Sequence, residues 1–222
     1  LSLMIVAAVA SVSTAGITGI NWNGGTATDQ GIVNQITIDF TGQYTGSQLL
    51  VELTEGSIFQ QTPFGSASAP SAALVTAFPD LANDSFATQG GTTSDTSDGA
   101  MSLGGGAVNI GGAASAQWDA TGLNQAWNPA PGVTVENKTA FVTTQITLSP
   151  DAVGTWRYLG SADGTFGVIS GRIGDEGEGG QNFSNGMDGT VANGVMTVIP
   201  EPATISIAAL ALLGLVGLRR RS

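Results

Sequence analysis

The residues best suited to chemistry in this sequence are carboxylates and tryptophans, because two common kinds of reactive side chain are missing. The chain has no histidine and no cysteine. This composition excludes Ser-His-Asp triads, histidine or cysteine zinc sites and thiol nucleophiles. The sequence therefore predicts a protein that is not an enzyme and that requires no cofactor.

Three carboxylates gather in one glycine-rich segment near the C-terminus. Asp175, Glu176 and Glu178 lie between Gly174 and Gly180. Carboxylate oxygens are ligands that Ca²⁺ prefers, so these residues are a candidate calcium site. Their spacing differs from that of an EF-hand loop, and a solvated acidic loop is the alternative interpretation.

Two tryptophans are the candidate residues for binding a sugar. Trp118 and Trp127 fall in a stretch of small and polar residues that predicts a long irregular connection. An indole can stack on the apolar face of a sugar ring while polar neighbours bind the sugar hydroxyls. A carbohydrate-binding module that uses Trp118 and Trp127 is therefore one hypothesis, and packing or loop anchoring is the alternative role for both side chains.

A glycan hydrolase that works with carboxylates alone is a third hypothesis. Glu52, Glu55 and Glu136 are the residues that could be proposed for it. Such a reaction needs two carboxylates facing each other at about 5 to 10 Å, a separation set in space rather than in sequence. The sequence therefore selects no pair.

The chain is acidic, with 17 Asp and Glu against 6 Lys and Arg, a net charge of −11. Half of the basic residues stand at the C-terminus, so Lys138, Arg157 and Arg172 are the only ones before them. An acidic surface repels nucleic acid and the anionic face of a membrane. We therefore expect no nucleic-acid partner.

Alternation of apolar and polar residues predicts the β-strands that position these side chains. The clearest runs cover residues 35–40, 48–53 and 140–148. Their inward-facing residues are predicted to be Ile36, Ile38 and Phe40, then Leu49, Val51 and Leu53, then Ala140, Val142, Ile146 and Leu148.

Turn signals connect the later strands. Ser149-Pro150-Asp151 and Asp163-Gly164 predict that residues 140–173 form a three-stranded antiparallel meander. Asn193-Gly194 predicts a last strand, residues 195–198. With 33 glycines and few helix-forming windows, the chain is expected to be all-β, with an antiparallel β-sandwich or jelly-roll fold.

The last segment of the chain has the features of a membrane anchor. An uncharged run, residues 203–218, follows two prolines and precedes three arginines. Sixteen residues of helix rise about 24 Å, slightly less than a ~30 Å hydrocarbon core, and snorkelling arginines can close that gap. We predict a transmembrane helix over 203–218 with its arginines on the cytoplasmic side, and a buried helix of a soluble domain is the alternative.

This segment resembles the PEP-CTERM sorting signal of Gram-negative bacteria. The resemblance rests on a tripeptide, an apolar run and a basic cluster in that order, and it covers about a tenth of the chain. It implies recognition by exosortase, a membrane-embedded cysteine protease, then processing near the tripeptide and delivery to the cell surface or the exopolysaccharide matrix. The residues that carry it are Pro200, Glu201 and Pro202 as sorting motif and Arg219, Arg220 and Arg221 as membrane stop.

The first residues agree with export. An apolar run over residues 1–10 and the small residues Ser13 and Ala15 predict a signal peptide, residues 1–15, that is cleaved after Ala15. The run has no basic residues before it and begins with Leu1, which predicts that the signal peptide is truncated at its start. A buried first strand is the alternative interpretation.

Together these patterns predict one passenger domain, residues 16–198, followed by a sorting segment, residues 199–222. The leading hypothesis is an exported cell-surface or matrix protein with a structural or adhesive passenger. The expected partners are exosortase, the secretion machinery, the inner membrane and exopolysaccharide.

Overall fold

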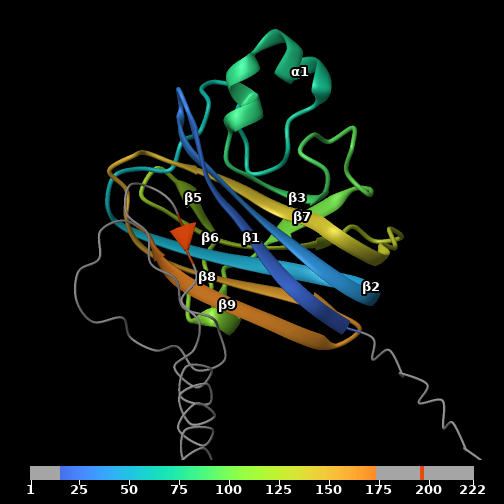
Figure 1. Cartoon of the computed structure of the whole chain (residues 1–222). Helices are drawn as coiled ribbons and strands as arrows, with labels where there is room; N and C mark the ends of the chain where they lie inside the picture. The colour runs from blue at the N-terminus through green and yellow to red at the C-terminus, as the bar shows by residue number, and fades with distance from the viewer. Residues whose placement is uncertain (1–15, 174–195, 198–222) are drawn as a thin grey trace, which may run out of the picture.

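The computed structural model describes residues 16–173 and 196–197, which form an antiparallel β-structure (Figure 1). In chain order the strands are β1 (Gly16–Thr28), β2 (Gly31–Glu55), β3 (Phe86–Gly90), β4 (Met101–Gly104), β5 (Gln117–Asp119), β6 (Gly122–Pro129), β7 (Glu136–Leu148), β8 (Val153–Ala162), β9 (Thr165–Ile173) and β10 (Met196–Thr197). The helices are short, namely α1 (Ala72–Ala77) and the 3-10 turns η1 (Pro79–Asn83) and η2 (Val108–Ile110).

The 25-residue strand β2 belongs to both halves of one curled sheet. Its first part pairs with β1 and β7, and β3 extends this half beyond β7. Its second part pairs with β6 and β8, and β4, β5, β9 and β10 extend this half at its two sides. The two halves lie as two layers over one another (Figure 1).

One hydrophobic core fills the space between the two layers. Residues from both parts of β2 share it with aromatic residues from β6, β7 and β8. The predicted inward residues of β2 are confirmed, since Ile36, Ile38, Phe40, Leu49 and Val51 are buried in this core and Leu53 packs against it. The all-β, antiparallel prediction is confirmed, while the two separate sheets of a sandwich are replaced by one sheet that β2 makes continuous.

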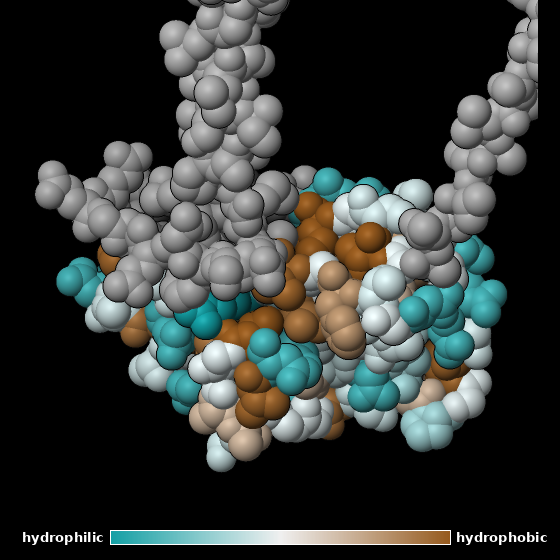
Figure 2. Space-filling view, turned by 90° about the horizontal axis from the view of Figure 1, so that it is seen from below, coloured by the Kyte–Doolittle hydropathy of each residue, from teal (hydrophilic) through white to brown (hydrophobic). Residues whose placement is uncertain are grey.

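A smaller apolar cluster lies on the outer face of the second half. Leu50 and Leu159 contact Ala107 and Ile110, so the segment that contains η2 covers part of this face. The Arg157 guanidinium donates to the carbonyl of Ile110 (2.8 Å) and helps to hold that segment. Figure 2 views the domain from the side of β9 and η2 and shows hydrophobic residues in patches among hydrophilic ones.

β2 changes direction between its two parts at a corner that contains two glycines. Gly42 and Gly46 have φ angles of +81° and +153°, which side chains rarely adopt. The pairing with β8 shifts by one residue here, because Tyr44 pairs with Ala162 and Gly46 with Ser161. A Cβ at Gly46 would stand 2.8 Å from the carbonyl oxygen of Trp127, so the corner also needs the small residue for space.

A buried chain of hydroxyl groups joins this corner to β8. Tyr44 donates to Ser47 Oγ (2.7 Å), which also bonds the hydroxyl of Tyr158 (2.6 Å). All three residues are buried, and Phe40 and Phe141 pack around Tyr44 with ring centroids 5.7 and 5.2 Å away. Burial raises the pKa of Tyr44, with a smaller effect of the neighbouring Tyr158, and burial also raises the pKa of Tyr158.

The alternation predicted for residues 140–148 is wrong in its first half. Ala140 is exposed with φ of +50°, and Phe141 takes the core position instead. The cause is a β-bulge, because Ile36 pairs with Thr144 and the next residue of β2 pairs with Val142. One extra residue, Thr143, shifts the side-chain alternation, so Phe141 faces the core together with Ile146.

The predicted meander is correct for its second hairpin only. Ala162 pairs with Thr165 around Asp163-Gly164, whose φ angles of 45° and 73° are those of a tight hairpin turn. β7 and β8 are not paired with each other, because each pairs with a different part of β2. The turn at residues 149–151 therefore carries the chain from one half of the sheet to the other.

The two buried tyrosines, which are the only tyrosines in the chain, predict how the domain responds to alkali. Since burial raises their pKa values, the folded state holds both phenol protons more tightly than the unfolded state. Their contribution to stability is complete below about pH 10 and is lost as the pH rises through the raised values. We expect tyrosinate absorbance to appear only with the loss of circular dichroism. Ionisation that precedes unfolding would contradict this.

Substitution Ser47→Ala should leave two buried phenol groups without their shared partner. We expect a loss of about 1–3 kcal/mol in the free energy of unfolding, measured in urea. Gln43→Ala, at an exposed position of the same corner, is the control and should change stability by less than about 0.5 kcal/mol. Equal effects of the two substitutions would show that the hydroxyl chain does not hold the corner.

Candidate functional site

Several predicted site residues lie outside the described residues. These are the candidate calcium ligands Asp175, Glu176 and Glu178, the sorting tripeptide 200–202 and the arginines 219–221, together with the predicted signal peptide and transmembrane helix. Within residues 16–173 and 196–197, no three acidic side chains are grouped so that they could hold a metal ion. The same part of the chain contains no helix long and apolar enough to cross a bilayer.

Trp127 lies in strand β6 and not in the irregular connection that the sequence predicts. Its side chain is 2 % exposed and packs in the core, where its ring centroid is 6.5 Å from that of Tyr158. A sugar ring cannot stack on a face that the core already covers. The prediction of Trp127 as an exposed sugar platform is therefore wrong, because the pairing of β6 with β2 turns this residue inward.

Trp118 lies in β5, also a strand, and is partly buried against the core. Its indole N–H donates to Oε1 of Gln60 (2.7 Å) in the segment that follows β2. Because an indole nitrogen can only donate, the amide of Gln60 must turn its oxygen toward Trp118 and its NH₂ group away. Trp118 thus anchors a loop, which is the alternative role that the sequence allowed.

The NH₂ group of Gln60 reaches a buried carboxylate. It donates to Asp84 Oδ2 (2.8 Å), while the backbone N–H of Gln61 donates to Oδ1 (2.9 Å). Asp84 is only 1 % exposed, and burial raises the pKa of its carboxyl group although the backbone and side-chain donors of residues 60 and 61 favour the charged form. Trp118, Gln60 and Asp84 form a polar clamp between β5, the segment after β2 and the start of β3.

Among the carboxylates considered for hydrolysis, Glu136 lies far from Glu52 and Glu55. Glu136 begins β7, where it pairs opposite Gln43 at the corner of β2. Glu52 and Glu55 lie at the far end of β2, at least nine strand positions away, or about 30 Å along an extended strand. Glu136 therefore cannot form a catalytic pair with either residue in this arrangement.

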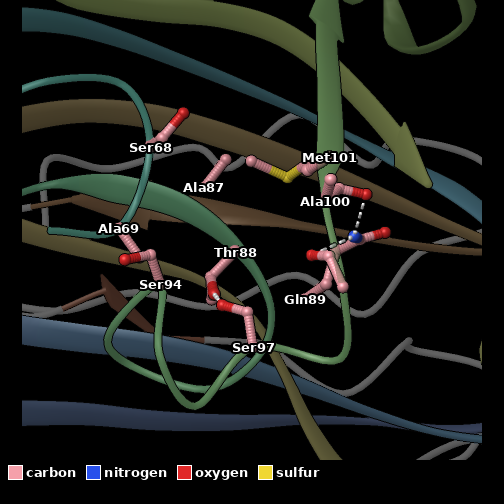
Figure 3. Close-up of a pocket in the computed structure, with 10 residues that line it drawn as sticks. Ser68, Ala69, Ala87, Thr88, Gln89, Ser94, Ser97, Ala100 and Met101 are labelled. Carbon is pink, nitrogen blue, oxygen red and sulfur yellow. Dashed lines mark hydrogen bonds between the residues drawn. The ribbon is translucent and has the colours of Figure 1, made fainter. Parts of the chain in front are cut away.

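A cavity of about 400 Å³ opens between β3 and β4 (Figure 3). Its polar groups mostly bond to the surrounding loop, since Gln89 Nε2 donates to the carbonyl of Ala100 (3.0 Å) and Thr88 Oγ1 bonds to Ser97 Oγ (3.2 Å). The remaining wall includes Ala69, Ala87, Ala100 and Met101. Among the described residues, the lining leaves the side-chain oxygen of Gln89 buried without a hydrogen-bond partner, and it offers no aromatic face to a ligand.

A second cavity, of about 310 Å³, lies at the corner of β2, and we call it the corner cavity. Its walls come from β2, β6, β8 and β9, and Trp127 is among the lining residues although its side chain packs in the core. The aromatic side chain that stands open to solvent at this cavity is Phe166, 65 % exposed. Sequence reasoning missed Phe166 because an aromatic residue in a strand next to a hairpin usually indicates the core.

The last described strand connects the domain to the C-terminal segment. β10 pairs with the end of β9, Met196 opposite Ile173 and Thr197 opposite Arg172. This agrees with the predicted strand at residues 195–198. Residues 198–221 match the PEP-CTERM protein-sorting motif. The PEP-CTERM motif thus begins directly after Thr197, the last described residue of β10.

The PEP-CTERM motif is recognised by exosortase and implies that the chain is exported and sorted through a membrane-anchored step. The resemblance noted at Pro200, Glu201 and Pro202 is therefore confirmed. Comparison of the chain with curated proteins and with solved structures gives no match. The motif assigns the route of the protein, and the folded domain itself has to be interpreted from its own geometry.

Two aspartates with opposite pKa shifts give a pH test of the polar clamp. The raised pKa of Asp84 means that its contribution to stability falls as the pH rises from the ordinary carboxyl value through the raised one. The pKa of the exposed Asp119 is lowered, first by the hydroxyl of Thr121, so its contribution falls as the pH drops.

We expect the free energy of unfolding of Asp84→Asn to rise relative to that of wild type as the pH increases from acid to neutral. For Asp119→Asn, the free energy of unfolding should fall relative to that of wild type over the same range. Urea unfolding at several pH values measures both differences. The same sign for the two variants would contradict the assignment of a buried charge to Asp84.

Proposed function

We propose that the protein is a non-enzymatic surface protein of a Gram-negative bacterium. A signal peptide directs it across the inner membrane, and the helix over residues 203–218 holds it there until exosortase acts near Pro200-Glu201-Pro202. The released domain then serves as a structural or adhesive unit at the cell surface or in the extracellular polysaccharide.

One observation carries this proposal. The folded domain closes its hydrophobic core with strands that end at β9, and β10 leads into the PEP-CTERM motif, which begins at the next residue. All of the core residues lie within residues 16–173, so cleavage within the motif leaves the core intact. A domain that stays folded after release suits a protein that acts outside the cell.

The side chains of the described residues support a structural role more than a catalytic one. The buried ionisable groups Asp84, Tyr44 and Tyr158 all bond to neighbouring protein groups. Asp98 forms an ion pair with Lys138 (2.8 Å) at the surface. A perturbed pKa indicates a catalytic group when the group lies in an accessible cleft, and these buried groups do not.

The proposed export and sorting route can be tested with a variant in which Pro200, Glu201 and Pro202 are all replaced by alanine. We expect the variant to accumulate at full length in the inner membrane, while wild-type chains appear in the outer or extracellular fraction with a new C-terminus. Fractionation followed by mass spectrometry of intact chains measures compartment and both termini together.

The matched control replaces Pro129 and Pro131, a second pair of prolines separated by one residue, within the folded domain. This control should be sorted like wild type because it leaves the motif unchanged. Wild-type chains that keep both termini and remain dissolved in the cytosol would refute the proposed route.

A further inference from the structure

Phe166 is the most exposed large hydrophobic side chain among the described residues, at 65 %. It stands in β9 opposite Ser161 of β8, as the second residue after the Asp163-Gly164 turn. Exposing an aromatic ring forgoes roughly 2 kcal/mol that burial would contribute. A single exposed apolar residue needs no explanation, so the surroundings of this ring decide its meaning.

The ring borders the corner cavity, whose other walls combine apolar and uncharged polar side chains. Leu159 is buried at 7 % exposure, and the polar side chains of Thr45, Gln48, Asn128 and Ser161 line the cavity with it. Among the described residues, no charged side chain lines the cavity. An apolar surface with a few placed polar groups is typical of a small-molecule site.

The polar groups of the corner cavity keep unused bonding capacity. The carbonyl oxygen of the Gln48 side chain is buried without a hydrogen-bond partner among the described residues, a state that costs free energy. The side-chain NH₂ group of Asn128 donates to the carbonyl of Pro129 (2.8 Å), and the amide oxygen of Asn128 remains available as an acceptor. In the bonded pair of hydroxyls of Thr45 and Ser161 (2.6 Å), one group donates to the other, which leaves the second hydrogen for a ligand.

This combination matches the chemistry of a sugar ring. A sugar presents an apolar C–H face that can lie on an aromatic ring, and hydroxyls at its rim that donate and accept. A volume of about 310 Å³ stands at the lower end of the range for ligand sites, so the cavity has room for about one or two sugar rings.

The negative charge of the chain favours neutral sugars over anionic ones as ligands. The chain carries a net charge of −11, and a carboxylated or sulfated glycan would need a cation in the site to offset that repulsion. The described lining of the corner cavity supplies none. A neutral glycan meets no such barrier.

We infer that the corner cavity binds a neutral sugar unit, with Phe166 as the stacking surface and the side chains of Gln48, Asn128 and the Thr45–Ser161 pair as its hydrogen-bonding groups. This deepens the proposed adhesive function and rests on it. The site replaces the tryptophan platform, because its aromatic ring is open to solvent while that of Trp127 is enclosed.

The test measures binding of cellohexaose, laminarihexaose and maltohexaose to the full chain in a zwitterionic detergent by isothermal titration calorimetry. We expect at least one of these neutral oligosaccharides to bind and oligogalacturonate, their anionic counterpart, to bind less tightly. Phe166→Ala should weaken the binding by about tenfold or more. Thr45→Val, which removes one hydroxyl of the bonded pair, should weaken it several-fold.

The matched control is Phe64→Ala. Phe64 is also exposed (43 %), but it stacks on Phe78 with centroids 4.3 Å apart and does not line the corner cavity. This control should bind like wild type, and circular dichroism should be the same for all variants because the substituted side chains are exposed.

Absence of binding by all three neutral oligosaccharides would overturn the inference, as would equal affinity of wild type and Phe166→Ala, or tighter binding of oligogalacturonate. None of these outcomes changes where the chain is found after cell fractionation. Failure of the sugar site is therefore distinguishable from failure of the proposed surface location.

Discussion

The fold depends on how one long strand changes direction inside a hydrophobic core. At the corner of β2, Tyr44 and Ser47 bring two hydroxyls into the core, and Tyr158 of β8 brings a third. A buried hydroxyl costs free energy unless it is bonded, so each of these groups is tolerated because the others are in place. Of the two bonds, the one between Ser47 and Tyr158 (2.6 Å) crosses from β2 to β8, and a shift of β8 along β2 would break it.

The same corner produces the outer surface that we assign to sugar binding. The register shift between Tyr44 and Gly46 adds Thr45 to β2 at this point, and its side chain bonds Ser161 on the other side of the sheet from the core. A bulge re-aims neighbouring side chains, so Tyr44 enters the core while Thr45 lines the corner cavity. The polar network inside and the cavity outside thus follow from one irregularity of one strand.

The sequence predicts which side chains face the core wherever apolar and polar residues alternate regularly. It does not predict their direction where a single bulge residue or pairing with a distant strand determines it. Within each part of β2 the period of two holds, so the inward residues could be predicted. Gly42 and Gly46 read as strand breaks, although the strand bends through them and continues. The bulge at Thr143 leaves no mark on composition. The burial of Trp127 could not be predicted because it depends on pairing of β6 with β2, some eighty positions earlier in the chain.

Strand β9 links the proposed binding site to the sorting segment. Phe166 stands near its start, and Arg172 and Ile173 near its end pair with β10, after which the PEP-CTERM motif begins. Arg172 lies six strand positions after Phe166, or about 20 Å along an extended strand. A chain held at its motif therefore keeps the corner cavity at the opposite end of β9 from the point of attachment. A ligand bound there would lie at the other end of β9 from Met196 and Thr197, the residues that pair with Ile173 and Arg172.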